Sequence, residues 1–211
     1  MSILTLGGLP EEDRQGNPIL PSFRNMIRLE ELYDDPELNN QERVLCGIRL
    51  LYGDTIPGNL EVAAKELMWF YYRGELPEEK GTAKGKRNVR IYDFEQDADC
   101  IYSAFLSAYG INLVDASLHW WEFMALFTTL PENTQMAQRM YYRGLDTSKL
   151  KGSWKKECEA RKKVFALKRR GNPALQNMTR EEIDQMTKDR VARRYAEAQR
   201  LLQEKRIQNE L

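Results

Sequence analysis

The sequence has few of the residues on which most catalytic and metal sites depend. Among its 211 residues there is one histidine, His119, and three cysteines, Cys46, Cys100 and Cys158. Histidine dyads and His-pair metal sites are therefore excluded. The three cysteines are odd in number and more than 50 residues apart, so they form neither a CxxC pair nor a disulfide framework. Such cysteine usage favours a reducing compartment.

Long apolar runs and recognised catalytic motifs are also lacking. The most apolar stretch, residues 118–127, is ten residues long and includes His119 and Glu122, whereas a membrane-spanning helix needs ~20 apolar residues. Residues 81–87 have the wrong spacing for a P-loop. The acids of residues 93–99 lack the glycine and glutamate of a calcium loop and fit a helix N-terminus better. We therefore expect a non-enzymatic protein with no catalytic residue, cofactor, metal or membrane span, in which His119 is a hydrogen-bonded histidine beside the core.

The net charge of zero results from the cancellation of two unlike parts. The first 100 residues contain 19 acidic and 12 basic residues, the next 48 contain 4 and 2, and the last 63 contain 9 and 18. We therefore divide the chain into an N-terminal arm with short strands (1–33), a helical core domain (34–148) and a basic helical C-terminal extension (149–211). Because the charges are segregated, neutrality excludes no charged partner.

Apolar residues at helical spacing, preceded by capping residues and followed by glycine or proline, predict a mainly α protein. The expected fold is a helical bundle with a short N-terminal extended or hairpin segment and a long C-terminal helix. The hairpin would pair residues 3–6 with residues 19–20. The predicted helices cover residues 22–32, 35–53, 59–73, 93–109, 115–130 and 133–143, and two more helical stretches lie on either side of Gly171–Pro173, the second running from 179 to about 209.

Two sets of side chains have predicted roles. The helix that holds the two adjacent tryptophans is apolar on nearly all sides, which is typical of the buried centre of a bundle. The core set is Phe105, Trp120, Trp121, Phe123 and Phe127. The C-terminal helix has a seam of residues at heptad spacing, but the seam lasts only two heptads, which is too short for a stable coiled coil. Its seam and adjacent basic residues are the predicted partner-binding residues: Val191, Tyr195, Ala198, Leu202, Arg193 and Arg194.

Several strings of the sequence resemble a family of bacteriophage proteins named after the fifteenth gene product of a temperate phage of Gram-positive hosts. They are Tyr92–Phe105, Tyr109–Leu113, Leu118–Phe127, Leu130-Pro131 and Tyr142-Arg143, with Ser22–Arg24 and the acid-and-helix pattern of residues 34–74 also similar. The resemblance covers roughly residues 15 to 150 and leaves out the basic tail.

The resemblance implies a role in the assembly of long phage tails. The expected function is that of a tail assembly chaperone in the host cell cytoplasm, with the tape measure and tail tube proteins as partners. Segregated charge also allows self-association, head to tail. The alternative is a structural virion component or a nucleic-acid-binding protein that acts through the basic C-terminal helices. Direct nucleic-acid binding is the weaker alternative, because no recognised binding module accompanies the charge.

Overall fold

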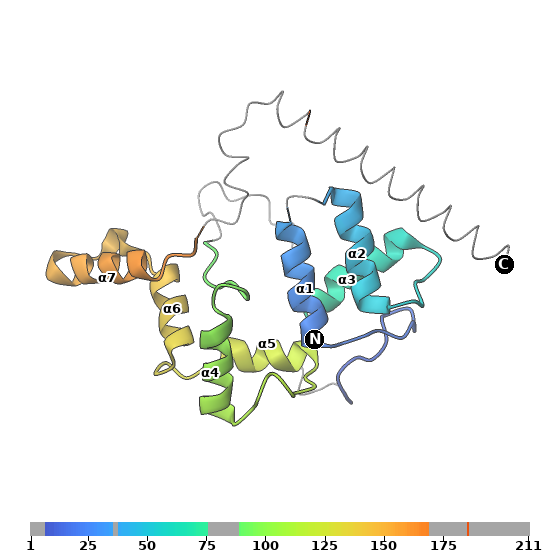
Figure 1. Ribbon diagram of the computed structural model, residues 1–211, viewed down its shortest axis with the longest axis horizontal. Coiled ribbons are helices and arrows are strands. Elements are labelled where there is room, and N and C mark those ends of the chain that lie inside the picture. Colours follow the sequence, from blue (N-terminus) through green and yellow to red (C-terminus); the bar gives the residue numbers. More distant parts are fainter. Residues whose placement is uncertain (1–6, 36–37, 76–88, 169–184, 186–211) are drawn as a thin grey trace, which may run out of the picture. The chain divides into compact units, whose positions relative to one another are not determined.

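The computed structural model describes residues 7–35, 38–75, 89–168 and 185. Within these residues the fold is mainly helical and contains no strand, which confirms the predicted fold class (Figure 1). Contacts divide the chain into residues 1–169 and 170–211. The helices are α1 (Phe23–Asp34), α2 (Asn40–Tyr52), α3 (Leu60–Tyr71), α4 (Ala98–Tyr109), α5 (Trp120–Thr128), α6 (Gln135–Gly144), the 3-10 turn η1 (Thr147–Lys149) and α7 (Gly152–Val164).

The first three helices form a continuous set in which α1 packs on α2 and α2 packs on α3. The Ser22 side chain accepts a hydrogen bond at the start of α1, and Asn59 caps α3, both as predicted. The predicted start of α2 at Asp35 is wrong. Asn39 caps this helix and forms a capping box with Glu42, because the Asn39 side chain and the Glu42 side chain each accept a backbone N–H of the other.

Helices α4 and α5 begin later than the sequence patterns predict. Asp93 does cap a turn, since its carboxylate accepts the backbone N–H groups of Glu95 and Gln96, but α4 starts only after Asp97. Helix α5 starts after His119 rather than at Asp115. Residues 113–115 instead form a turn, in which the Asn112 side chain accepts the backbone N–H of Val114.

One hydrophobic core joins residues of α1 to α6, with α5 at its centre. The Phe123 ring stacks on Phe23 of α1 at 4.8 Å between centroids and on Phe105 of α4 at 5.0 Å. All five side chains of the predicted core set are at most 3% exposed. Burial of several aromatic rings on one helix makes α5 the element on which the other helices are positioned.

The segment before α1 is attached to the helical body rather than separate from it. Residues 11–19 form a tight loop closed by a single bridge between Glu12 and Pro18. The Asp13 carboxylate accepts from two backbone N–H groups of this loop and from the Tyr52 hydroxyl of α2 at 2.7 Å. Arg14 donates two side-chain hydrogen bonds to the buried Glu66 of α3. The predicted pairing of residues 3–6 lies outside the described residues.

Helix α7 belongs with the helical body by its contacts, although its charge resembles that of the tail. It packs on α6 and η1, its Cys158 is fully buried, and Lys162 donates a hydrogen bond to the Leu145 carbonyl at 2.7 Å. The contact division after Arg169 therefore lies 21 residues beyond the boundary drawn from charge at 148/149. A change in net charge along the sequence shows where the surface composition changes, whereas buried contacts show where the packed unit ends.

Candidate partner-binding surfaces

The single histidine has a structural position at the start of α5. The backbone N–H of Trp121 donates to His119 Nδ1 at 2.9 Å, and His119 Nε2 lies 3.0 Å from the carbonyl oxygen of Pro10. Nδ1 therefore accepts and Nε2–H donates, which is the neutral imidazole. Burial lowers the pKa of His119 and so favours this form. The residue joins the N-terminal segment to the helix that centres the core.

The acid-rich segment before α4 contains two buried carboxylates, Asp93 and Asp97, both 1% exposed. Arg143 of α6 donates to both carboxylate oxygens of Asp97, and Arg139 donates to one at 2.9 Å. Burial would raise the pKa of Asp97, but these hydrogen bonds outweigh it and hold the pKa below its usual range. Arg143 also donates to the carbonyls of Ile91 and Phe165, so this ion pair joins α4, α6 and the end of α7.

The two adjacent tryptophans bind the end of α3 through their indole nitrogens. Trp120 donates to the Tyr71 carbonyl at 2.9 Å and Trp121 to the Phe70 carbonyl at 2.8 Å. Carbonyls in the last turn of a helix have no partner within the helix, and these indoles supply one. The strings that carry the family resemblance thus hold the fold together. Among the residues that the structure describes, no group of three His, Cys, Asp or Glu side chains is placed to bind a metal.

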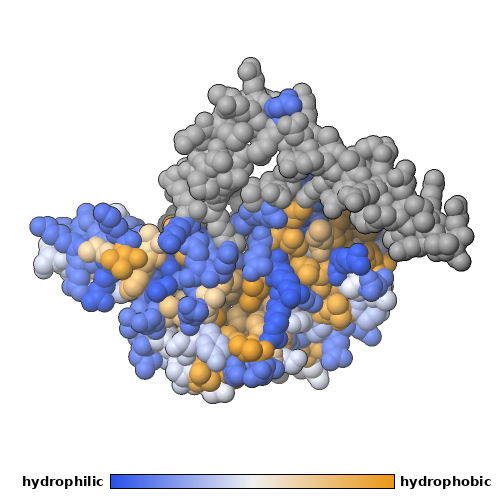
Figure 2. Space-filling view, viewed as in Figure 1, coloured by the Kyte–Doolittle hydropathy of each residue, from blue (hydrophilic) through white to orange (hydrophobic). Residues whose placement is uncertain are grey.

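An open groove lies between α1 and α3. It has a volume of about 270 Å³, and Tyr33 and Tyr72 on its walls are 45% and 37% exposed. Charged side chains also line the groove, and one of them, Arg90, forms an ion pair with Asp34 at 2.6 Å. Figure 2 shows hydrophobic and hydrophilic residues side by side on the visible face of the helical body. We call it the α1–α3 groove; its lining residues are Leu29, Glu30, Tyr33, Asp34, Met68, Tyr71, Tyr72 and Arg90.

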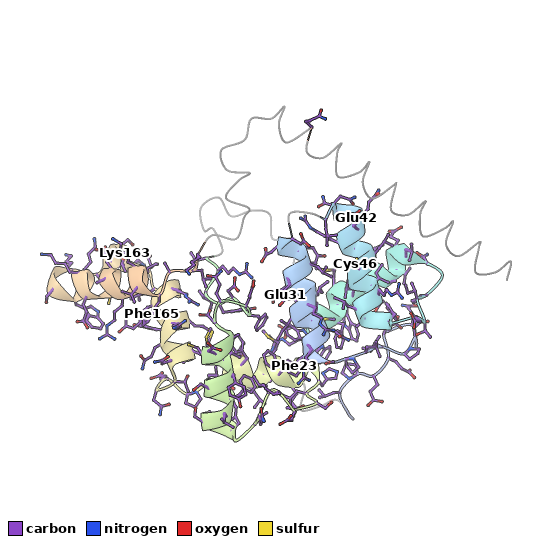
Figure 3. The ribbon with its side chains drawn as sticks, viewed as in Figure 1. Phe23, Glu31, Glu42, Cys46, Lys163 and Phe165 are labelled. Atoms are coloured by element: carbon purple, nitrogen blue, oxygen red, sulfur yellow. The ribbon has the colours of Figure 1, made fainter. Side chains whose placement is uncertain are left out.

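A second exposed surface lies on α7. Trp154 and Val164 are 48% and 78% exposed, and Arg161 and Lys163 are also exposed. Trp154, Arg161 and Val164 share one side of the helix because they are seven and three residues apart. Figure 3 labels Lys163 and Phe165 on different sides of α7, and the Phe165 ring lies 6.0 Å from that of Tyr142 on α6. We call Trp154, Arg161 and Val164 the α7 surface; Lys163, nine residues from Trp154, lies on the opposite side of the helix.

Comparison with protein families shows to which family the chain belongs. Residues 9–167 match the family described as Bacteriophage Gp15 protein. The chain belongs to this family. The match confirms the resemblance inferred from the sequence strings. Neither the curated proteins nor the solved structures include a match to this chain.

The Gp15 match extends beyond the resemblance at both ends. It starts at residue 9, within the segment that His119 contacts through Pro10, and it ends at residue 167, beyond α7. The family region thus coincides closely with the packed unit that ends at Arg169. The partner-binding residues predicted from the seam, Val191, Tyr195, Ala198, Leu202, Arg193 and Arg194, lie outside the described residues. No helix in the described part of the chain is long and apolar enough to cross a membrane.

Sequence reasoning missed the α1–α3 groove. Tyr33 and Tyr72 lie at the ends of their helices, where each ring can lie half outside the core. The signal in the sequence that could have indicated the groove was the pair Tyr71-Tyr72, because only Tyr71 fits the apolar stripe of α3. Trp154 and Cys158 are four residues apart and so share one stripe of α7, yet the structure buries Cys158 and leaves Trp154 about half exposed. Periodicity assigns a helix face but does not determine how much of its edge a neighbour covers.

Proposed function

We propose that this Gp15-family protein is a non-enzymatic tail assembly factor that acts in the host cell cytoplasm as a chaperone for the tape measure protein, the tail tube protein or both. The observation that carries the proposal is the α1–α3 groove. Its walls combine exposed tyrosines with Met68, a flexible side chain that adapts to varied apolar partners. Membership in a phage protein family supports the choice of phage proteins as the clients.

The size and composition of the groove favour a helix over a small molecule as its occupant. Its volume of about 270 Å³ is below the ~300–1,000 Å³ of most small-ligand sites. Two tyrosines at its walls remain partly open to solvent. An amphipathic helix docks in such a groove by inserting one or two apolar side chains while its polar face stays wet. Tape measure proteins are long and helical, so they offer many such segments.

The test is co-expression of the full chain with tape measure segments or with tube protein, followed by affinity capture. We expect Tyr33→Ala to reduce the captured client about tenfold or more, because an exposed tyrosine at the centre of a contact is a common hot spot. Leu106→Ala is the matched control, since Leu106 on α4 is also 45% exposed but lies outside the groove. Equal capture by both variants would contradict the groove as the client site.

Virion composition tests the chaperone role separately. A chaperone should be absent from purified virions while it co-purifies with its client from infected cells. Stoichiometric protein in mature tails would refute the chaperone role and favour a structural virion component.

A second candidate function, nucleic-acid binding, is favoured by one observation. Residues 149–168 carry eight basic and two acidic side chains, and the last turn of α7 holds Arg161, Lys162 and Lys163. Binding through such charges falls steeply with salt. We would measure binding of the full chain to a random DNA duplex from low to high salt. Binding at low salt that weakens as salt rises supports this function, and no binding at low salt removes it.

A further inference from the structure

Helix α7 has little buried surface of its own. Of its 13 residues only Cys158 is buried, whereas α3 and α5 each bury five residues. It packs on α6 and η1, and Cys158 lies outside the hydrophobic core that joins α1 to α6. Elements with few buried apolar contacts open locally at a lower free-energy cost than unfolding of the whole protein. The attachment of α7 therefore depends on the contacts at its ends.

Three side chains of the body hold the chain just after α7. Arg143 donates to the Phe165 carbonyl at 2.6 Å, and the Arg139 guanidinium lies 5.9 Å from the centroid of the Phe165 ring. The Gln96 amide donates to the Lys168 carbonyl at 3.1 Å and accepts the Lys168 backbone N–H at 2.8 Å. These contacts tie the end of α7 to α6 and to the segment before α4. We call Gln96, Arg139, Arg143, Phe165 and Lys168 the latch.

The latch can open without leaving a buried charge unpaired, because each of its three body side chains has a second partner within the body. Arg143 and Arg139 both donate to the Asp97 carboxylate. Gln96 also donates to the Asp93 carboxylate at 3.1 Å. When the chain after α7 leaves, these pairs remain, and the released backbone groups bond to water. The large penalty for an unpaired buried charge therefore does not arise.

We propose that α7 opens from the body by release of the latch while α1 to α6 stay folded. Residues 145–151, which connect α6 to α7 through η1, are the hinge. Opening separates Arg161 from the Tyr142 ring, whose centroid lies 5.3 Å away, and releases Lys162 from a carbonyl of the hinge. It exposes Cys158 and the side of α6 that α7 covers. The opening depends only on contacts within the packed unit, so failure of the proposed function leaves it unaffected.

The Cys158 thiol reports the opening, because the residue is 0% exposed and a thiol reagent reaches it only in an open state. The experiment uses the full chain with Cys46→Ser and Cys100→Ser, which leave Cys158 as the sole thiol. Its reaction with an aromatic disulfide reagent is followed by absorbance, without denaturant and at low urea concentrations. Urea unfolding followed by tryptophan fluorescence measures the global stability of the same protein. Labelling that requires global unfolding rises with urea as steeply as the unfolding equilibrium, whereas labelling through local opening rises less.

Variants in this two-serine background distinguish the latch from the body. Gln96→Ala removes both hydrogen bonds to Lys168. Gln41→Ala on α2 is the matched control, because it makes the same change at an exposed position away from the latch. Gly47→Ala overpacks α2 against two leucine side chains and so destabilises the body. If Gly47→Ala does not fold, Ile48→Val at a buried position of α2 replaces it.

We expect Cys158 in the background protein to react faster than global unfolding allows, with a rate that rises only weakly with urea. Gln96→Ala should raise the rate about fivefold or more, because the closed state loses two hydrogen bonds, and Gln41→Ala should leave it unchanged. Gly47→Ala should lower the urea midpoint but not change the labelling rate, since the body is folded in both the closed and the open state.

Three results would overturn the proposal. The first is labelling no faster than global unfolding allows. The second is a folded Gln96→Ala protein that labels like the background protein. The third is a labelling rate of Gly47→Ala that rises in proportion to its loss of global stability, because Cys158 would then be reached only through unfolding of the body.

Discussion

Removal of Arg143 should destabilise the protein more than any other substitution of an arginine in the described residues. The Arg143 side chain is 6% exposed and that of its partner Asp97 is fully buried. In addition to two hydrogen bonds to Asp97, Arg143 donates to the carbonyls of Ile91 and Phe165. Arg143→Met keeps most of the side-chain volume but leaves a buried carboxylate with only Arg139 as its cation.

The expected cost of Arg143→Met is about 3 kcal/mol of unfolding free energy at neutral pH. Breaking a buried ion pair by removing one partner costs ~3–5 kcal/mol, and Arg139, which still donates to Asp97 at 2.9 Å, places the value at the lower end. The control is Arg49→Met. Its partner Asp54 is 91% exposed, and exposed ion pairs contribute ~0–1 kcal/mol. Urea unfolding followed by tryptophan fluorescence measures both, since three of the four tryptophans are buried.

The pH dependence gives this prediction its sharpest test. The folded pKa of Asp97 is below its ordinary value, so its contribution to wild-type stability is present above the unfolded value of about 3.9 and is lost as pH falls below it. Without Arg143 the buried carboxylate is protonated at a higher pH than in the wild type. The deficit of Arg143→Met should therefore shrink as pH falls from 7 towards 4. A deficit below about 1 kcal/mol at pH 7, or one that is constant with pH, would refute the buried ion pair.

Three further substitutions test other parts of the fold. Gly47→Ala should cost ~1–3 kcal/mol of unfolding free energy by overpacking, because the added carbon would lie 2.7 and 2.9 Å from two leucine side chains. Gly58→Ala is the control: this glycine has open space around it, so the substitution should be near neutral in the same urea assay. Trp121→Ala should cost ~3–5 kcal/mol, and a near-neutral melt would show that this ring is not packed as described. His119→Asn should keep the α5 cap, because asparagine also caps helices, but it should remove a pH dependence of the stability. The pKa of His119 is lowered in the folded protein, so the stability of the wild type falls as pH drops below about 6.5. A wild type and variant with parallel melting temperatures between pH 7.5 and 5.5 would contradict this.

Local signals in the sequence were sufficient for the helices and for several of their ends. Ser22 and Asn59 cap α1 and α3 as predicted, because a capping side chain bonds to backbone only two or three residues away. Asp35 and Asp115 were also capable of capping a helix, yet Asn39 and His119 do so. When several residues can cap, burial of the apolar face decides which helix start is used, and burial is not a local property.

The sequence by itself determined the mainly helical class, the segregation of charge and the family, since composition, periodicity and short strings are properties of neighbouring residues. Only the tertiary structure decided that Asp97 pairs with Arg143 across 46 residues and that Trp121 binds the end of α3. It also decided that α7, basic like the tail, belongs to the packed body through the buried Cys158. Long-range partners are selected by the joint packing of all helices, so no local pattern specifies them.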